Sequence, residues 1–150
     1  MGRLPILDKP NFDTEPFANT CFEVWQQDKP ERKGEPFLAV QPLSGMSFQG
    51  VKCLLRKHDA KLAALITAWN PGRLESDAYN LAANARLLKT LQDSGHAVYP
   101  ARGTALAGDW FEDSYLIVGG AYEQYVTWQK TFEQLAFVLF RTDGAVELRW

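Results

Sequence analysis

Hydrophobic residues recur along this chain with two different periods, which separate predicted strands from predicted helices. The run from Leu62 to Trp69 contains a single polar residue, Thr67, and is too short for an independent helix. Such a run is typical of a strand that is covered on both faces. Asn70-Pro71-Gly72 ends it, because proline removes a backbone donor and disfavours helix at the preceding residue, while glycine frees the turn.

A long helix is predicted from Asp77 to about Asp93. Ser76 stands where an N-cap belongs, and its hydroxyl can accept an otherwise unpaired amide, which is worth about 1 kcal/mol. On a helical wheel, Asn80 and Asn84 lie beside the apolar stripe and away from the charged residues. The residues that form this predicted stripe are Leu81, Ala85, Leu88 and Leu91.

Two interpretations of the amide pair stay open. A buried amide without partners costs about 1–3 kcal/mol, so both side chains need hydrogen bonds. In the first interpretation Asn80 and Asn84 bond the loop from Asn70 to Ser76 and fasten the helix to it, which is the usual arrangement of buried polar groups. In the second they line a pocket.

The remaining patterns complete an α+β fold. In chain order they predict strands at Cys21–Trp25 and Phe37–Val40, a short helix at Ser47–His58 with Ser47 as its cap, a strand at His96–Tyr99, a loop at Pro100–Asp109, a strand at Trp110–Val118, a helix at Ala121–Glu133 and a hairpin around Thr142-Asp143-Gly144. We therefore predict an N-terminal arm over residues 1–16 and a single α+β domain over residues 17–150. Its sheet is mixed, mostly antiparallel, with six to seven strands packed by two long helices and one short helix. The segment from Leu62 to Tyr99 fits a right-handed parallel crossover.

Composition excludes several classes of protein. At 150 residues with 46% hydrophobic content, the chain is long and apolar enough to bury a core. Its net charge of −2, with acids and bases interspersed, gives no electrostatic footprint for nucleic acid. No apolar run approaches the roughly 20 residues that span a bilayer. Two cysteines and two histidines offer too few ligands for a metal site. We expect a cytoplasmic protein without metal, cofactor, membrane or nucleic-acid partner.

Polar residues come first on two predicted elements, which suggests a shared site. Along the strand that begins at Trp110, Glu112 and Ser114 precede aliphatic residues on one face. Asn80 and Asn84 likewise precede leucines on the long helix. If both stripes face the same core, their polar ends meet, with Asn70 arriving from the end of the preceding strand. This predicts a hollow lined by amides, a hydroxyl and one carboxylate.

The order and spacing of these residues resemble a bacterial family known as domain of unknown function 3293. The resemblance covers about residues 62–140. It rests on ITAWNPG (Ile66 to Gly72), Ser76, Asn80, Asn84, Leu88, Leu91, Gly103, WFEDS (Trp110 to Ser114) and, more weakly, QLAF (Gln134 to Phe137). At Asp113 the family pattern usually has proline. The resemblance implies a small cytoplasmic bacterial protein and no particular activity, and its polar positions match Asn70, Ser76, Asn80, Asn84, Glu112, Ser114 and Gln134.

Glu112 is the one acid among these residues and is the candidate catalytic residue. Trp110 and Phe111 would partly desolvate it, and a desolvated carboxyl has a raised pKa suited to general acid or base work. In the alternative interpretation Glu112 only accepts hydrogen bonds from the loop and holds it shut. Arg73 and Arg102 flank the predicted site and would suit a phosphate or carboxylate, although each is also an ordinary surface arginine.

Two functions are consistent with the sequence. The first is binding of, or action on, a small polar or anionic ligand such as a nucleotide or sugar phosphate, and it predicts a concave pocket. Its candidate ligand-binding residues are Asn70, Arg73, Ser76, Asn80, Asn84, Arg102, Ser114 and Gln134. The second is a non-catalytic interaction module or homodimer, in which these residues are a structural lock and an exposed apolar patch meets a partner or a second copy.

Overall fold

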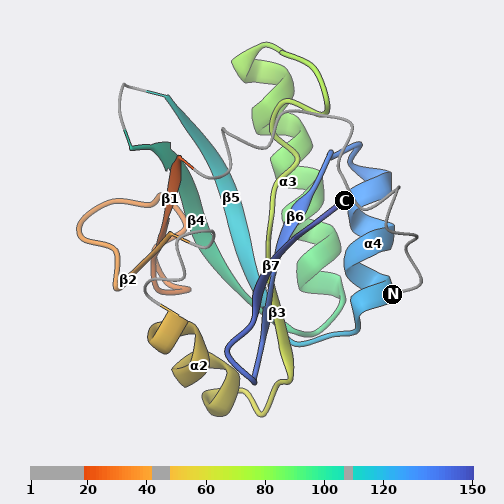
Figure 1. The fold of residues 1–150 in the computed structure, drawn as a ribbon. Helices are drawn as coiled ribbons and strands as arrows, with labels where there is room; N and C mark the ends of the chain where they lie inside the picture. Colours follow the sequence, from red (N-terminus) through yellow and green to blue (C-terminus); the bar gives the residue numbers. More distant parts are fainter. Residues whose placement is uncertain (1–18, 42–47, 107–109) are drawn as a thin grey trace.

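The computed structural model describes residues 19–41, 48–106 and 110–150 (Figure 1). Its elements are β1 (Thr20–Val24), β2 (Leu38–Val40), α2 (Phe48–Lys57), β3 (Leu62–Ile66), α3 (Asp77–Asp93), β4 (Ala97–Ala105), β5 (Phe111–Val118), α4 (Tyr122–Thr131), β6 (Phe137–Arg141) and β7 (Val146–Arg149). The seven strands form one sheet in the order β2-β1-β4-β5-β3-β6-β7. All neighbouring pairs are antiparallel. The α+β class is therefore confirmed, and the predicted hairpin around Thr142-Asp143-Gly144 is formed by β6 and β7.

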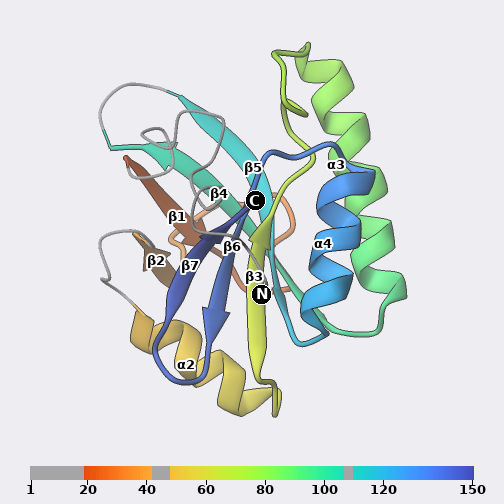
Figure 2. The same cartoon turned by 45° about the vertical axis from the view of Figure 1, so that its right-hand side comes forward.

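The sheet curls into a half-barrel and carries helices on both faces (Figures 1 and 2). On one face α2 packs Val51 and Leu55 against Leu116 and Phe140 in a first core. On the other face α3 and α4 pack against Ile117 and Leu139 in a second core. Because side chains alternate along a strand, each central strand contributes to both cores. Within the described part of the chain, no helix is long and apolar enough to cross a membrane.

The predicted loop over residues 100–109 is wrong, because β4 continues to Ala105. Proline rarely occupies a central strand, since it cannot donate to the ladder. Here the Pro100 carbonyl accepts from the Trp25 amide at 2.9 Å, so the nitrogen of Pro100 also faces that side. Val24 is the last β1 residue paired with β4, so the missing donor lies where β1 ends and costs little.

The buried face of α3 also differs from the prediction. Ala83, Leu87 and Leu91 are buried together with both asparagines, whereas Leu81 is 59% exposed and Ala85 is exposed. The helix is turned so that the amides face inward, because they satisfy buried backbone groups that a leucine would leave unpaired.

The predicted crossover from Leu62 to Tyr99 does not form a parallel pair. β3 and β4 run in the same direction and are joined by α3, but β5 lies between them and is antiparallel to both. The predicted arm over residues 1–16 and the Ser47 cap lie outside the described residues.

Candidate functional site

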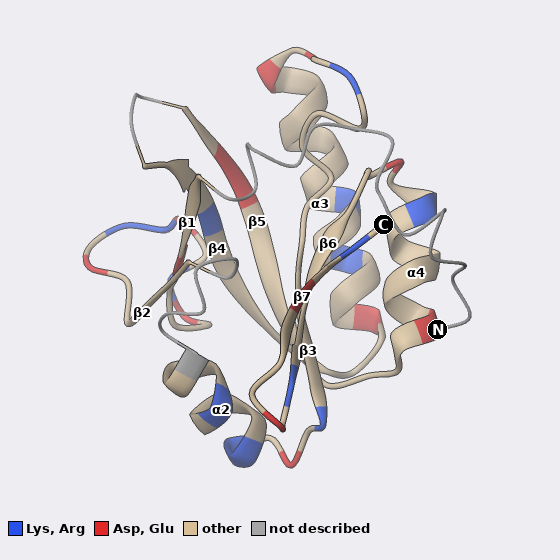
Figure 3. Cartoon of the chain, viewed as in Figure 1, with Lys and Arg blue, Asp and Glu red and all other residues tan. Residues whose placement is uncertain are grey.

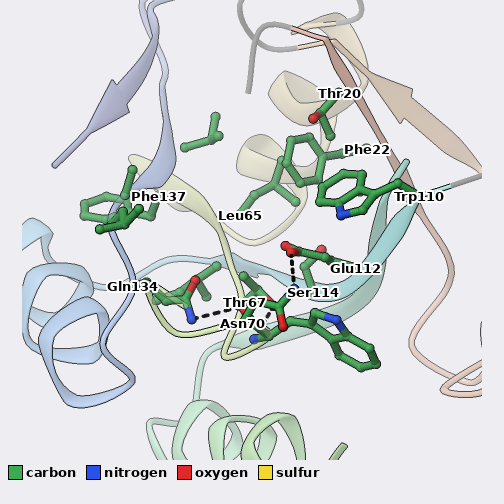
Figure 4. Close-up of a pocket in the computed structure, with 17 residues that line it drawn as sticks. Thr20, Phe22, Leu65, Thr67, Asn70, Trp110, Glu112, Ser114, Gln134 and Phe137 are labelled. Atoms are coloured by element: carbon green, nitrogen blue, oxygen red, sulfur yellow. Dashed lines mark hydrogen bonds between the residues drawn. The ribbon is translucent and has the colours of Figure 1, made fainter. Parts of the chain in front are cut away.

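A pocket of about 250 Å³ lies on the sheet face that carries α2, at the end of the sheet away from that helix (Figure 4). Five strands and three loops contribute to its lining, which is mostly apolar. The described residues that define it best are Thr20, Phe22, Leu65, Thr67, Trp69, Asn70, Gly103, Trp110, Glu112, Ser114, Gln134 and Phe137.

The hollow arises from a change of side-chain size along β4 and β5. Near α2, Tyr99 lies opposite Leu116, and both are fully buried. Further along, Gly103 lies opposite Glu112 and has no side chain of its own, so the side chains of Phe22 and Thr20 lie close to its backbone. A Cβ atom at Gly103 would lie 3.0 Å from Phe22 Cε1, so a larger residue at position 103 would crowd the Phe22 ring.

Glu112 is the only ionisable side chain among the described residues that line the pocket. Burial raises the pKa of its carboxyl to about 7, and the hydrogen bond from Asn70 partly opposes this shift. That bond, from Asn70 Nδ2 to Glu112 Oε1, is 3.3 Å long. The carboxyl therefore changes charge near neutral pH, where a general acid or base works best.

Ser114 follows Glu112 on the same face of β5 and is 2% exposed. Its Oγ has no hydrogen-bond partner among the described residues. A buried hydroxyl without a partner costs about 1–3 kcal/mol, so this atom requires an explanation.

Asn70 is held in place by helix α3 and by its own loop. Its φ of +46° lies in the left-handed region, which asparagine tolerates better than most residues. The Asn70 amide donates to Asn80 Oδ1 at 2.8 Å. Its Oδ1 accepts from Asn80 Nδ2 at 2.9 Å and from the Glu75 amide at 3.0 Å. These bonds leave Asn70 Nδ2 directed at Glu112.

Asn80 fastens α3 to the Asn70–Ser76 loop, as the first interpretation of the amide pair described, because it bonds Asn70 and the Glu75 carbonyl. Asn84 instead bonds residues outside that loop. Its Oδ1 accepts from the Ala68 amide and its Nδ2 donates to the Asp113 carbonyl, both at 2.8 Å. The expectation that the helix stripe and the Glu112 face share one core is wrong, because α3 packs in the second core and Glu112 faces the other side of the sheet. Asn70 connects the two by reaching around the end of β3.

The two arginines lie outside this pocket. Arg73 Nη1 pairs with Glu133 at 2.9 Å in a separate groove. Arg102 Nε pairs with Asp113 Oδ1 at 2.7 Å, and its guanidinium stacks on Phe111. Figure 3 shows one basic stretch on β4 beside an acidic stretch on β5. Neither arginine is therefore placed to neutralise Glu112.

Two further candidates have local structural contacts. Ser76 caps α3 and accepts from the Tyr79 amide at 3.1 Å. Gln134 lines the pocket, where its Nε2 donates to the Trp69 and Phe132 carbonyls at 3.3 Å. Among the described residues, no group of three or more His, Cys, Asp or Glu side chains is arranged to hold a metal ion.

Sequence reasoning placed no residue of β1 in the site. Thr20 and Phe22 reach the pocket because β1 pairs with β4, in the register that sets Phe22 beside Gly103. This pairing joins segments about eighty residues apart, and no local pattern encodes it. Gly103 and the small residues near it were the available signal.

A shallower groove adjoins the pocket and shares Trp69, Asn70 and Trp110 with it. Leu74, Leu81 and Phe111 line the groove and are 87%, 59% and 47% exposed. The chain thus carries both a pocket and an exposed apolar surface, the two features that the alternative functions predicted.

Residues 66–137, slightly under half of the chain, match the family model described as protein of unknown function (DUF3293). No curated protein and no solved structure matches the chain. The matched segment includes the loop with Asn70, helix α3 and strand β5. The resemblance expected from the sequence is therefore confirmed: over the segment that supplies Asn70, Glu112, Ser114 and Gln134, the chain resembles the DUF3293 family.

Proposed function

We propose that this protein binds a small molecule in the pocket at Glu112, with the polar end of the ligand against Glu112 and Ser114. The observation that carries the proposal is the Ser114 hydroxyl, which is buried beside the pocket without a partner in the described part of the chain. A ligand with a hydrogen-bonding group at this point would satisfy it.

A purely structural lock accounts less well for Glu112. Its one hydrogen bond with the described residues is long, and burial of the carboxyl makes the charged form costly. In a lock, glutamine or an apolar residue would serve without this cost. Asn80 and Asn84, in contrast, are fully engaged with the loop and β5, and we assign them to holding the site.

The lining also narrows the class of ligand. The walls are mostly apolar, and the one charge among the described lining residues is the carboxyl. A phosphate at Glu112 would face another negative charge. Arg73 and Arg102 would not offset this repulsion, because they pair with Glu133 and Asp113. We therefore favour a ligand with an apolar body and a neutral or positive polar end over a nucleotide or sugar phosphate. The family resemblance supports a cytoplasmic bacterial protein as part of this proposal.

Acid–base catalysis on the bound molecule is a second function that one observation favours. A carboxyl with a pKa of about 7 can donate or accept a proton at neutral pH. Glu112 is the residue to which we assign this role.

A fragment library screened by thermal shift tests the binding proposal. We expect hits that raise the melting temperature of the wild type, and we expect Glu112→Gln and Ser114→Ala to weaken them. Glu123→Gln, which alters an exposed acid on α4 away from the pocket, is the matched control and should respond like the wild type. A screen without hits, or hits indifferent to both pocket variants, would contradict the proposal.

Association through the exposed groove is the remaining candidate, favoured by Leu74, Leu81 and Phe111. Sedimentation of the wild type and of Phe111→Ser tests it. A homodimer that the substitution dissociates would support association, and a monomer at all concentrations would exclude a homodimer.

A further inference from the structure

We propose that the ligand of this pocket is a primary alkylamine, whose ammonium group sits between Glu112 and Ser114 Oγ while its hydrocarbon chain lies along the apolar wall. This inference rests on the proposed binding function and adds the charge and shape of the ligand.

Among the described residues, no cation pairs with Glu112. Three arginines, on the β1–β2 loop, the β3–α3 loop and β4, pair with other acids. Arg102 pairs with Asp113 at 2.7 Å, and Arg32 approaches the same carboxylate at 3.7 Å. Arg73 pairs with Glu133. The neighbouring acid Asp113 thus has two arginine partners. Glu112 has only the side-chain amide of Asn70 as a partner in the described residues.

The hydrogen-bond donors of an ammonium group match the acceptors that the pocket offers. An ammonium group carries three donors and no acceptor. The pocket offers the carboxylate of Glu112 and the hydroxyl oxygen of Ser114, which can rotate its hydrogen away and accept. A carboxylate ligand would leave Glu112 facing a like charge. An alcohol would form weaker, uncharged hydrogen bonds at the same place.

An aromatic surface lies beside the Glu112 carboxyl. Phe22 pairs with Gly103, and Gly103 pairs with Glu112, so the ring and the carboxyl flank a glycine on one face of the sheet. Trp110 immediately precedes β5 and lines the same pocket, and Figure 4 shows both rings beside Glu112. Aromatic faces attract an organic cation as well as its carbon chain.

The remainder of the pocket lining suits an unbranched alkyl chain. From Glu112 the pocket continues to Leu65, Phe137 and Val138, which are apolar and close to fully buried. Thr67 has its hydroxyl engaged by the Asp113 carbonyl and the Trp69 amide. A hydrocarbon chain therefore meets a wall with few unpaired polar groups.

Proton linkage gives this inference a signed consequence. Binding an ammonium group requires ionised Glu112, whose pKa of about 7 in the free protein falls when a cation is near. The affinity for an amine should rise as pH increases from 6 to 8, where the amine itself stays protonated. No other ionisable side chain of the described residues lines the pocket, and Arg102 and Asp113 on the flanking strands are paired with each other. A carboxylate ligand would show the opposite trend.

The experiment compares n-hexylamine, n-hexanol and hexanoate by titration calorimetry and NMR on the full chain at pH 6, 7 and 8. We expect hexylamine to bind about tenfold or more tightly than hexanol at pH 8, the size of a charge-assisted hydrogen bond. We expect no binding of hexanoate. Glu112→Gln should remove the preference for the amine and its pH dependence, while hexanol binding persists.

Equal or tighter binding of hexanol or hexanoate, or an amine affinity that falls with increasing pH, would overturn the inference. If the three compounds fail to bind, this inference also fails, whereas the binding function stands or falls separately with the fragment screen. The wild-type pH series and the matched compounds decide the question even if Glu112→Gln does not fold.

A free amine and a lysine side chain present the same chemistry. Nα-acetyl-lysine N-methylamide, whose backbone would extend toward the adjoining groove, separates these sources. Tighter binding than hexylamine identifies a polypeptide side chain as the occupant, and weaker binding identifies a free amine. Both results support an ammonium site.

Discussion

At Glu112, a carboxyl lies in a largely apolar pocket, and within the described part of the chain the amide of Asn70 is its hydrogen-bond partner. The cost of this arrangement falls on the ionised form, since burial outweighs the hydrogen bond from Asn70. The protonated form is tolerated, so the folded protein holds this proton more tightly than the unfolded chain does.

The stability of the protein should therefore decline as pH rises through the pKa of Glu112. Because the folded pKa of about 7 exceeds the ordinary glutamate value of 4.5, the favourable contribution is complete below pH 4.5 and is lost by about pH 8. We expect Glu112→Gln, which is uncharged at every pH, to gain about 2 kcal/mol relative to the wild type between pH 5 and pH 8. Urea unfolding of both proteins at the two pH values measures this. An unchanged difference would show that Glu112 has an ordinary pKa.

Asn80 and Asn84 form a natural matched pair, since both are buried amides on α3 with different partners. Replacing either by alanine should cost about 1–3 kcal/mol, because it leaves buried backbone or amide groups unpaired. Asn80→Ala should also release Asn70 and raise the pKa of Glu112 further, whereas Asn84→Ala should leave that pKa unchanged. Denaturant unfolding and an NMR titration of the Glu112 carboxyl separate the two effects. Equal pKa values in both variants would remove the positioning role of Asn80.

On the scale of elements, α3 shows how buried polar contacts set the orientation of a helix. Its apolar residues alone favour a stripe through Leu81 and Leu88, yet the amides of Asn80 and Asn84 determine which face turns inward. The loop before the helix and the backbone of β5 supply their partners.

Leucines on two sides of α3 should respond very differently to truncation. Leu87 is fully buried in the second core, while Leu81 is 59% exposed. We expect Leu87→Ala to cost about 2–5 kcal/mol and Leu81→Ala to stay within about 0.5 kcal/mol. Chemical denaturation of the two variants checks this, and similar costs would place the helix in the orientation that the wheel predicted.

Local patterns were sufficient for most elements and for part of the pocket. The alternation along β5 placed Glu112 and Ser114 on one face, and the Asn-Pro-Gly break located Asn70. The length of β4 was missed, because Pro100 is acceptable only at the point where β1 ends. The contribution of Phe22 and the pairing of Arg102 depend on long-range strand register, which residue spacing does not reveal.

For the whole molecule, the two cores share the same central strands and should therefore unfold together. Leu55 on α2 belongs to the first core and Leu139 on β6 to the second, and both are almost completely buried. We expect Leu55→Ala and Leu139→Ala each to cost about 2–5 kcal/mol and to preserve a single transition. Coincident circular dichroism and tryptophan fluorescence curves would bear this out, whereas separate transitions would mean that the faces are independent.

Adjacent acids on β5 have opposite fates because the strand turns successive side chains to opposite faces. Asp113 pairs with two guanidinium groups, while Glu112 faces the hollow, where the described lining residues include no arginine. The two faces of the sheet thus give adjacent carboxyl groups different electrostatic surroundings. Inserting one residue between Asp113 and Ser114, with the buried end of β5 held in register, would exchange the surroundings of the two acids and turn Asp113 toward the hollow and Glu112 toward the arginines. Ligand binding in the pocket therefore depends on whether the number of residues between Trp110 and Ser114 is odd or even, and not only on which amino acids are present.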